Sequence, residues 1–115
     1  MANDFKNAIA QNISNASGGT TLYTVPATKT SIMLELDIAN TTQNVVEASV
    51  EVLDSSVSSS AWRYLVKNAP VPSGSSLMVI AGQKIVLEAG DKVRVTSSAA
   101  SVMDAVAAIL EDVNS

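Results

Sequence analysis

The chain of 115 residues contains no histidine and no cysteine. Without histidine it can form neither a Ser-His-Asp triad nor an imidazole metal site. Without cysteine it has no disulfide, no thiolate nucleophile and no zinc–thiolate site. Neither a Walker A sequence nor a GxGxxG motif is present. The abundant serines therefore have no histidine base to activate them, and most classes of catalytic machinery are excluded.

Basic residues and long apolar runs are also scarce. Lysine and arginine number 7 against 11 aspartates and glutamates, which gives a formal net charge of -4. An acidic chain is repelled by phosphate backbones, so we expect no nucleic-acid partner. No apolar run reaches the roughly 18 residues that span a bilayer, and the polar start Met1–Asp4 is unlike a signal peptide. We expect a soluble protein that is made in the cytoplasm and has no membrane partner.

The apolar residues that are present are mostly aliphatic, since 47% of the chain is hydrophobic and only 3% is aromatic. This composition suits pleated strands. The stretch Gly82–Ser97 contains two alternating runs, Lys84–Glu88 and Lys92–Thr96, separated by the turn sequence of residues 89–91. Alternation broken by a Gly-Asp turn predicts a β-hairpin.

Two further segments alternate clearly, Ser31–Ala39 and Val46–Val52, with the polar residues 40–44 between them. We interpret them as antiparallel neighbours. Their polar parity faces outward, and their apolar parity is expected to face the core. The residues predicted to be core-facing are Ile32, Leu34, Leu36, Ile38, Val46, Val50 and Val52.

The remaining chain supplies shorter strand candidates. The segment Asn68–Gly74 contains Pro70 and Pro72, which lack a backbone donor, so it is expected to cross between sheets. The segment Val102–Val113 has both a helical and a two-sided apolar strand pattern, and its strand-like neighbours favour the strand. The other predicted strands are Phe5–Ser14, Thr20–Val25, Ala61–Lys67 and Ser76–Ile80.

About eight or nine short antiparallel strands separated by Gly, Pro, Asn and Ser turns predict a single all-β domain, a β-sandwich of the jelly-roll type. We assign residues 20–115 to this sandwich domain. Residues 1–19 are expected to form an N-terminal arm or an edge strand, since a loop at residues 15–19 separates them from the rest.

Carboxylates are the only catalytic candidates left. Glu35 and Asp37 share a strand face at about 7 Å, a spacing that overlaps the range of inverting glycosidases. Alternation places both on an exposed face, so a solvated surface is the favoured interpretation. Asp54 and Asp91 fall at turns, where turn chemistry is favoured over Ca²⁺ binding. We therefore expect no enzyme activity, no catalytic residues, no cofactor and no metal.

Some apolar residues exceed what one small sandwich can bury. The segments Ser76–Ile80 and Val102–Leu110 are apolar on both faces, which suggests contact with another subunit. Trp62 and Tyr64 could form a platform for a sugar ring, although a core or interface role is favoured. The predicted interface residues are Phe5, Ile9, Ile13, Met78, Ile80, Met103 and Ile109.

Three phrases of the sequence carry a family resemblance. They are Leu22–Pro26 (LYTVP), Val66–Leu77 (VKNAPVPSGSSL) and Gln83–Val95 (QKIVLEAGDKVRV). In this order they resemble small β-sandwich virion structural proteins of tailed bacteriophages, notably marine and cyanobacterial phages. The resemblance covers nearly the whole chain after Thr20, and its motifs are turns and strand ends.

The resemblance implies a capsid decoration or cement protein that binds the head shell and stabilises it. It implies a homo-oligomer, most simply a trimer, because an icosahedral shell offers three-fold positions. The expected partner is the phage major capsid protein or another virion protein, and the expected location is the capsid surface after synthesis in the host cytoplasm. The alternatives are an adaptor in the tail, neck or fibre, or a module that binds host-surface glycans. The family has no catalytic residues to carry over.

Overall fold

The computed structural model describes residues 4–58 and 60–111, except for the side chains of residues 81–83. No described residue is helical, and eight strands account for most of this part of the chain. The strands are β1 (Asp4–Ala10), β2 (Thr20–Thr24), β3 (Ser31–Asn40), β4 (Val46–Leu53), β5 (Trp62–Val71), β6 (Ser76–Leu87), β7 (Lys92–Ser97) and β8 (Met103–Glu111).

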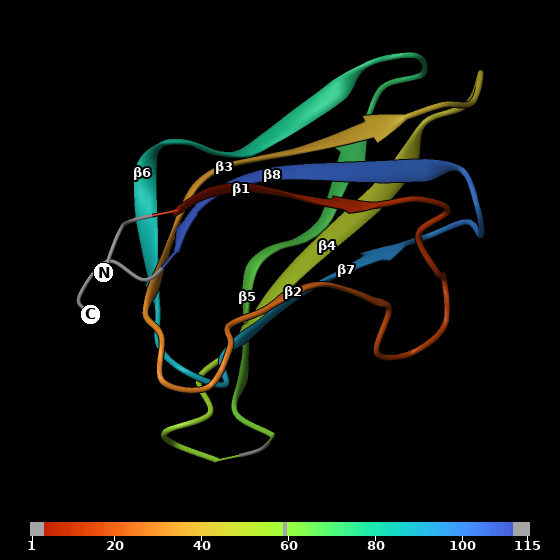
Figure 1. Ribbon diagram of the computed structural model, residues 1–115. Coiled ribbons are helices and arrows are strands. Elements are labelled where there is room, and N and C mark those ends of the chain that lie inside the picture. Colours follow the sequence, from red (N-terminus) through yellow and green to blue (C-terminus); the bar gives the residue numbers. More distant parts are fainter. Residues whose placement is uncertain (1–3, 59, 112–115) are drawn as a thin grey trace.

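The strands form two four-stranded antiparallel sheets that pack face to face (Figure 1). Sheet A has the order β1-β8-β3-β6, and sheet B has the order β2-β7-β4-β5. Every connection except β4–β5 passes from one sheet to the other. This is the strand order of a jelly roll. The predicted all-β sandwich of the jelly-roll type is confirmed.

Two predicted strand pairings are wrong. β6 lies in sheet A and β7 in sheet B, so Gly82–Ser97 is an arch between sheets and not a hairpin. The turn pairs with the end of β2 instead, because Val25 N–H donates to Asp91 O and Gly90 N–H donates to Val25 O. β3 and β4 likewise lie in different sheets. In a jelly roll, strands that follow each other in sequence seldom pair.

A bulge in β3 changes which of its residues face the core. The pairing of β3 shifts register between Met33 and Glu35 against both β6 and β8. Such an extra residue inverts the alternation beyond it. Met33, Leu36 and Ile38 are therefore fully buried, whereas Ile32 and Leu34 are only half-buried. The prediction that Ile32 and Leu34 face the core together with Leu36 is wrong.

The hydrophobic core lies between the sheets and is almost entirely aliphatic. Sheet A contributes Leu36, Ile38 and Ile80, and sheet B contributes Val50 and Val93. Val46 is also buried, and Val52 packs partly buried against this cluster. Each large aliphatic side chain removed from water contributes about 1.5–3 kcal/mol.

The C-terminal and N-terminal segments are both strands of sheet A. β8 confirms the strand interpretation of Val102–Val113, whose last two positions lie outside the described residues. β1 occupies the edge of sheet A and pairs with β8 of the same chain from Asp4 to Ala10. Within the segment 1–19, the residues of β1 are thus part of the chain's own sheet.

Edge strand β5 is longer than the proline pattern predicts. Pro70 pairs with Glu47, and the strand continues to Val71. A proline is accommodated here because β5 is an edge strand, where a missing donor need not interrupt a ladder. The chain crosses to sheet A only over residues 72–75, so the prediction that the crossing begins at Asn68 is wrong.

Candidate functional site

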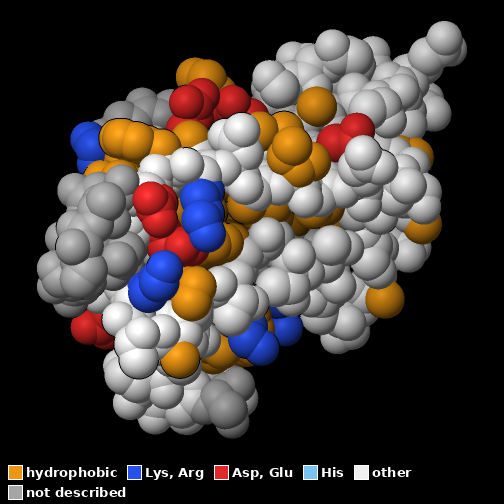
Figure 2. All heavy atoms as spheres, in the orientation of Figure 1, with side chains coloured by type: hydrophobic (Ala, Val, Ile, Leu, Met, Phe, Trp, Pro, Cys, Tyr) orange, Lys and Arg blue, Asp and Glu red, His pale blue; other side chains and the backbone are white. Residues whose placement is uncertain are grey.

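The outer face of sheet A is apolar along two rows that cross its strands. In the first row, Phe5 of β1 pairs with Leu110 of β8, and Leu110 pairs on its other side with Ile32 of β3. Ile32 in turn pairs with Val86 of β6. A second row places Ile9, Val106 and Met78 around Asp37. We call these residues, Phe5, Ile9, Ile32, Met78, Val86, Val106 and Leu110, the apolar face. On the side of the molecule seen in Figure 2, hydrophobic side chains are exposed next to a group of basic and acidic ones.

The apolar face includes only part of the predicted interface. Phe5, Ile9 and Met78 are indeed exposed, with 78%, 62% and 60% of their surface accessible. Val86 and Val106, which were not predicted, are exposed beside them.

Four of the predicted interface residues are core residues instead. Ile13, Ile80, Met103 and Ile109 are at most 1% exposed. Ile13 closes one end of the sandwich, where its N–H donates to Met103 O. Because these side chains fill the chain's own interior, they are not available to a second subunit. The prediction that they contribute to an interface is wrong for this fold.

Asp37 is the one carboxylate set among the apolar residues of the second row. Its pairing partners are Val106 and Met78, and its Oδ1 is buried without a hydrogen-bond partner among the described residues. A buried carboxylate oxygen without a donor is unfavourable. Glu35, its predicted neighbour, is exposed. The two carboxylates therefore lie in different environments and do not form a buried pair.

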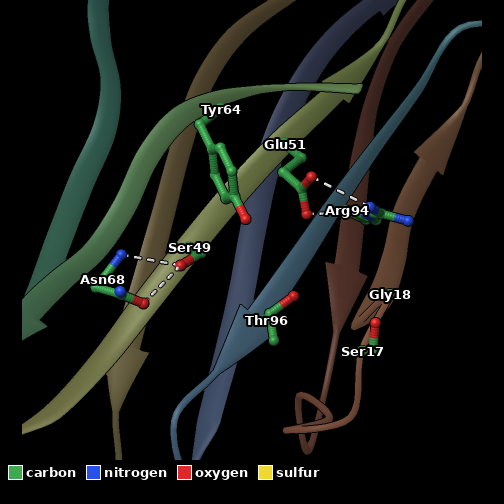
Figure 3. Close-up of a pocket in the computed structure, with 8 residues that line it drawn as sticks. All are labelled: Ser17, Gly18, Ser49, Glu51, Tyr64, Asn68, Arg94 and Thr96. Atoms are coloured by element: carbon green, nitrogen blue, oxygen red, sulfur yellow. Dashed lines mark hydrogen bonds and ion pairs between the residues drawn. The ribbon is translucent and has the colours of Figure 1, made fainter. Parts of the chain in front are cut away.

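The outer face of sheet B differs from that of sheet A, because it carries a polar groove of about 240 Å³ (Figure 3). The groove runs over β4, β5 and β7 and is bordered by the loop that precedes β2. Its lining residues are Ser17, Gly18, Ser49, Glu51, Tyr64, Asn68, Arg94 and Thr96.

A fixed arginine–glutamate pair forms one side of the groove. Arg94 donates from Nε to Glu51 Oε1 at 3.0 Å and from Nη2 to Glu51 Oε2 at 3.1 Å. The same guanidinium stacks on Trp62, with its central carbon 3.8 Å from the ring centroid. Both side chains of the ion pair are mostly shielded from solvent, being 21% and 13% exposed. Bidentate pairing and stacking together restrict the guanidinium to one orientation.

A backbone irregularity in β5 places Asn68 at the groove. The pairing of β4 with β5 shifts register between Ala48 and Val50, and Asn68 has a positive φ of 53°. Asparagine tolerates this left-handed conformation better than most residues. Its backbone N–H donates to Ser49 Oγ at 2.9 Å, and the Ser49 hydroxyl lies 3.4 Å from Asn68 Oδ1. Bulges of this kind re-aim a side chain and are frequent beside functional sites.

Tyr64 supplies the aromatic part of the groove. It lies opposite Glu51, is 51% exposed, and has Lys67 Nζ 5.3 Å from its ring centroid. A second register shift, between Val50 and Glu51, separates Tyr64 from Val66, which packs against the core. Trp62 and Tyr64 therefore lie on the outer face, whereas Val66 faces the core.

The turn aspartates behave as turn residues. Asp91 is buried, and its Oδ1 accepts hydrogen bonds from the backbone N–H and the hydroxyl of Ser55, while its Oδ2 accepts one from Glu88 N–H. Asp54 accepts two bonds from Ser56. Carboxylate oxygens of Asp54, Glu88 and Asp91 lie within 4.8 Å of one another. Since both Asp91 oxygens already bind donors of the protein, the expected turn chemistry accounts for this cluster.

A buried carboxylate links the two sheets at the β1–β2 edge. Glu111 is 1% exposed, accepts a hydrogen bond from the Tyr23 hydroxyl, and pairs with Lys6 Nζ at 2.8 Å and Lys29 Nζ at 3.7 Å. The bonds from Lys6 and Tyr23 lower the pKa of Glu111 below its ordinary value. Burial, and then the Glu111 bond, raise the pKa of Tyr23 to about 12. The bond to Glu111 raises the pKa of Lys6. This cluster joins strands of the two sheets.

No protein-family model matches the chain, and searches of curated proteins and of solved structures find no significant match. Among the described residues there is no helix long and apolar enough to cross a membrane.

Proposed function

We propose that this chain is a non-enzymatic virion structural protein of a tailed phage, a decoration protein that attaches to the head shell as an oligomer. The observation that carries the proposal is the apolar face of sheet A. A solvated antiparallel sheet normally turns polar residues outward. Here Phe5, Ile9, Met78 and Val86 are each at least 60% exposed on one face. Large apolar side chains exposed together on one face mark a protein contact surface.

The partner is expected to be a second copy of the chain together with the shell protein. Burying each exposed aliphatic residue contributes up to about 1.5–3 kcal/mol, scaled by the area still accessible. Several such residues offset a cost of association of about 4–15 kcal/mol. The apolar face thus supports a modest interface that is reinforced by repetition on a particle.

The jelly roll is consistent with this assignment only by analogy. Folds of this type form viral capsid domains and also lectins, so the fold alone does not decide between assembly and binding. The resemblance of residues after Thr20 to phage virion proteins is what directs the proposal to a capsid surface.

The oligomer is tested with a pair of matched variants. We expect light scattering to report a trimer for the native chain and a monomer for the double variant Ile9→Ser/Val86→Ser, which removes one residue from each row. Val57→Ser is the control, because Val57 is equally exposed, at 68%, but lies in the loop between β4 and β5. A native chain that stays monomeric, or a double variant that assembles as well as the control, would contradict the proposal.

The location is tested on purified particles of the phage that encodes the chain. Gold-conjugated antibody against the protein is expected to label the head in many copies. Labelling confined to the tail, neck or fibres would replace the decoration role by that of an adaptor. Particles without any label would overturn the assignment to the virion.

A further inference from the structure

We propose that the groove on the outer face of sheet B binds a short neutral carbohydrate of one or two sugar rings through Tyr64, Asn68 and the Glu51–Arg94 pair. This site lies on the opposite sheet from the apolar face. The inference therefore goes beyond the proposed decoration role and does not depend on where the protein is located.

The charge balance of the groove selects a neutral ligand. Arg94 is the basic residue that lines it, and Nε and Nη2 of this residue are already bound to Glu51. An anion would have to compete with that bidentate carboxylate. A cation would have to compete with Arg94 for Glu51, the single carboxylate of the lining. What the groove offers is a mixture of donors and acceptors without net charge, which matches hydroxyl groups.

Several polar groups of the lining retain hydrogen-bonding capacity. Within the described part of the chain, the Tyr64 and Thr96 hydroxyls, Asn68 Nδ2 and Arg94 Nη1 make no hydrogen bond. A sugar hydroxyl both donates and accepts, so each of these groups could bind one. The Tyr64 ring adds an amphipathic surface against which the C–H face of a sugar ring can pack. Apolar and polar contacts thus converge in one cavity, as small-ligand sites require.

The site is also preorganised. Glu51 and Arg94 fix each other, Trp62 stacks on the guanidinium, and the bulge fixes the Asn68 backbone against Ser49. Ligand binding therefore orders few additional side chains, which limits the entropic cost. The volume of about 240 Å³ lies below the roughly 300–1,000 Å³ of pockets for larger organic ligands. That volume limits the ligand to one or two rings.

The test is a titration of the native protein, observed by NMR, with glucose, galactose, mannose, N-acetylglucosamine and their β-linked disaccharides. Concentrations up to about 10 mM detect a dissociation constant near 1 mM. We expect at least one sugar to cause saturable shifts of Arg94 and Asn68 and saturation transfer from the Tyr64 ring. The absence of saturable shifts in the groove with every sugar of this panel would overturn the proposal.

Two groove variants and one control identify the contacts. Tyr64→Ala is expected to weaken binding about tenfold or more, since truncating an aromatic anchor has that effect. Asn68→Gly removes the amide while glycine keeps the positive φ, so binding should fall without a change in fold. Met78→Ala, on the opposite face, should bind as the native chain does. Equal affinity in all three variants would refute the groove as the site, and shifts centred on the apolar face would assign binding elsewhere.

Discussion

The Tyr23 hydroxyl offers a sharp test of the link between the two sheets. Tyr23→Phe removes the donor to Glu111 and keeps the ring that packs against the core. A hydrogen bond to a charged, buried group is worth about 1.5–3 kcal/mol. Tyr64→Phe is the matched control, because the exposed Tyr64 hydroxyl has no partner among the described residues.

Urea unfolding measures both variants. We expect Tyr23→Phe to lower the free energy of unfolding by about 1.5–3 kcal/mol, and Tyr64→Phe to change it by less than about 0.5 kcal/mol. At roughly 4 °C per kcal/mol for a domain of this size, Tyr23→Phe should lower Tm by about 6–12 °C. If the two variants had the same stability, Glu111 would not depend on Tyr23, and the argument for a sheet-to-sheet link would fail.

The same bond predicts how stability depends on pH. The pKa of Tyr23 is raised from 10.0 to about 12. Its contribution to the free energy of unfolding is therefore complete below pH 10 and is lost as the pH rises toward 12. The raised pKa of Lys6 acts in the same direction, because the stability that Lys6 contributes is lost as the pH rises above 10.5. The lowered pKa of Glu111 gives a contribution that is lost as pH falls below about 4.5. Tyr23→Phe should therefore lose less stability than the native chain between pH 10 and 12, which unfolding at fixed pH values measures.

Two further pairs of substitutions, each a test and its control, probe a close approach and a turn by the same unfolding assay. Gly19→Ala should lower the free energy of unfolding by more than about 2 kcal/mol, because the added Cβ would lie 2.3 Å from Val95 O at a residue with positive φ. Gly74→Ala is the control, since Gly74 also has a positive φ but has open space around it. It should cost only about 1 kcal/mol. If Gly19→Ala and Gly74→Ala destabilised the protein equally, the steric explanation for Gly19 would be contradicted. Asp91→Ala should cost about 3 kcal/mol through its three lost bonds, and Asp54→Ala, at an exposed position, less than about 1 kcal/mol. A reversed order would show that the arch does not depend on Asp91.

The sequence predicts the strands of this protein better than their partners. Alternation locates β3, β4 and β7 because a half-buried strand must alternate. It does not reveal that Lys92–Ser97 pairs with Val46–Leu53, since that pairing depends on an arch around the buried Asp91. Local turn chemistry favours a hairpin at the same residues, and tertiary contacts override it.

The candidate site was predictable only in part. Trp62 and Tyr64 stand out as rare aromatics, and the sugar-platform alternative follows from them alone. The pairing of Arg94 with Glu51 could be predicted only if β7 were known to lie beside β4, because that arrangement brings the two residues opposite each other. The Asn68 contribution requires the bulge in β5, which no alternation pattern records. The bulge in β3 likewise explains why alternation alone predicts the wrong face for Ile32.

The opposite characters of the two outer faces have a consequence for display. If the apolar face of sheet A is fixed to a particle, sheet B and its groove must point outward, because the sandwich is only two sheets thick. Each copy on the shell would then present one groove to the surroundings in the same orientation. Linked sites convert weak single contacts into avidity gains of about 10²–10⁴-fold when they can be engaged together. A shell that carries many such grooves would therefore bind a glycan-coated surface stably, although a single isolated copy would dissociate from the same surface quickly.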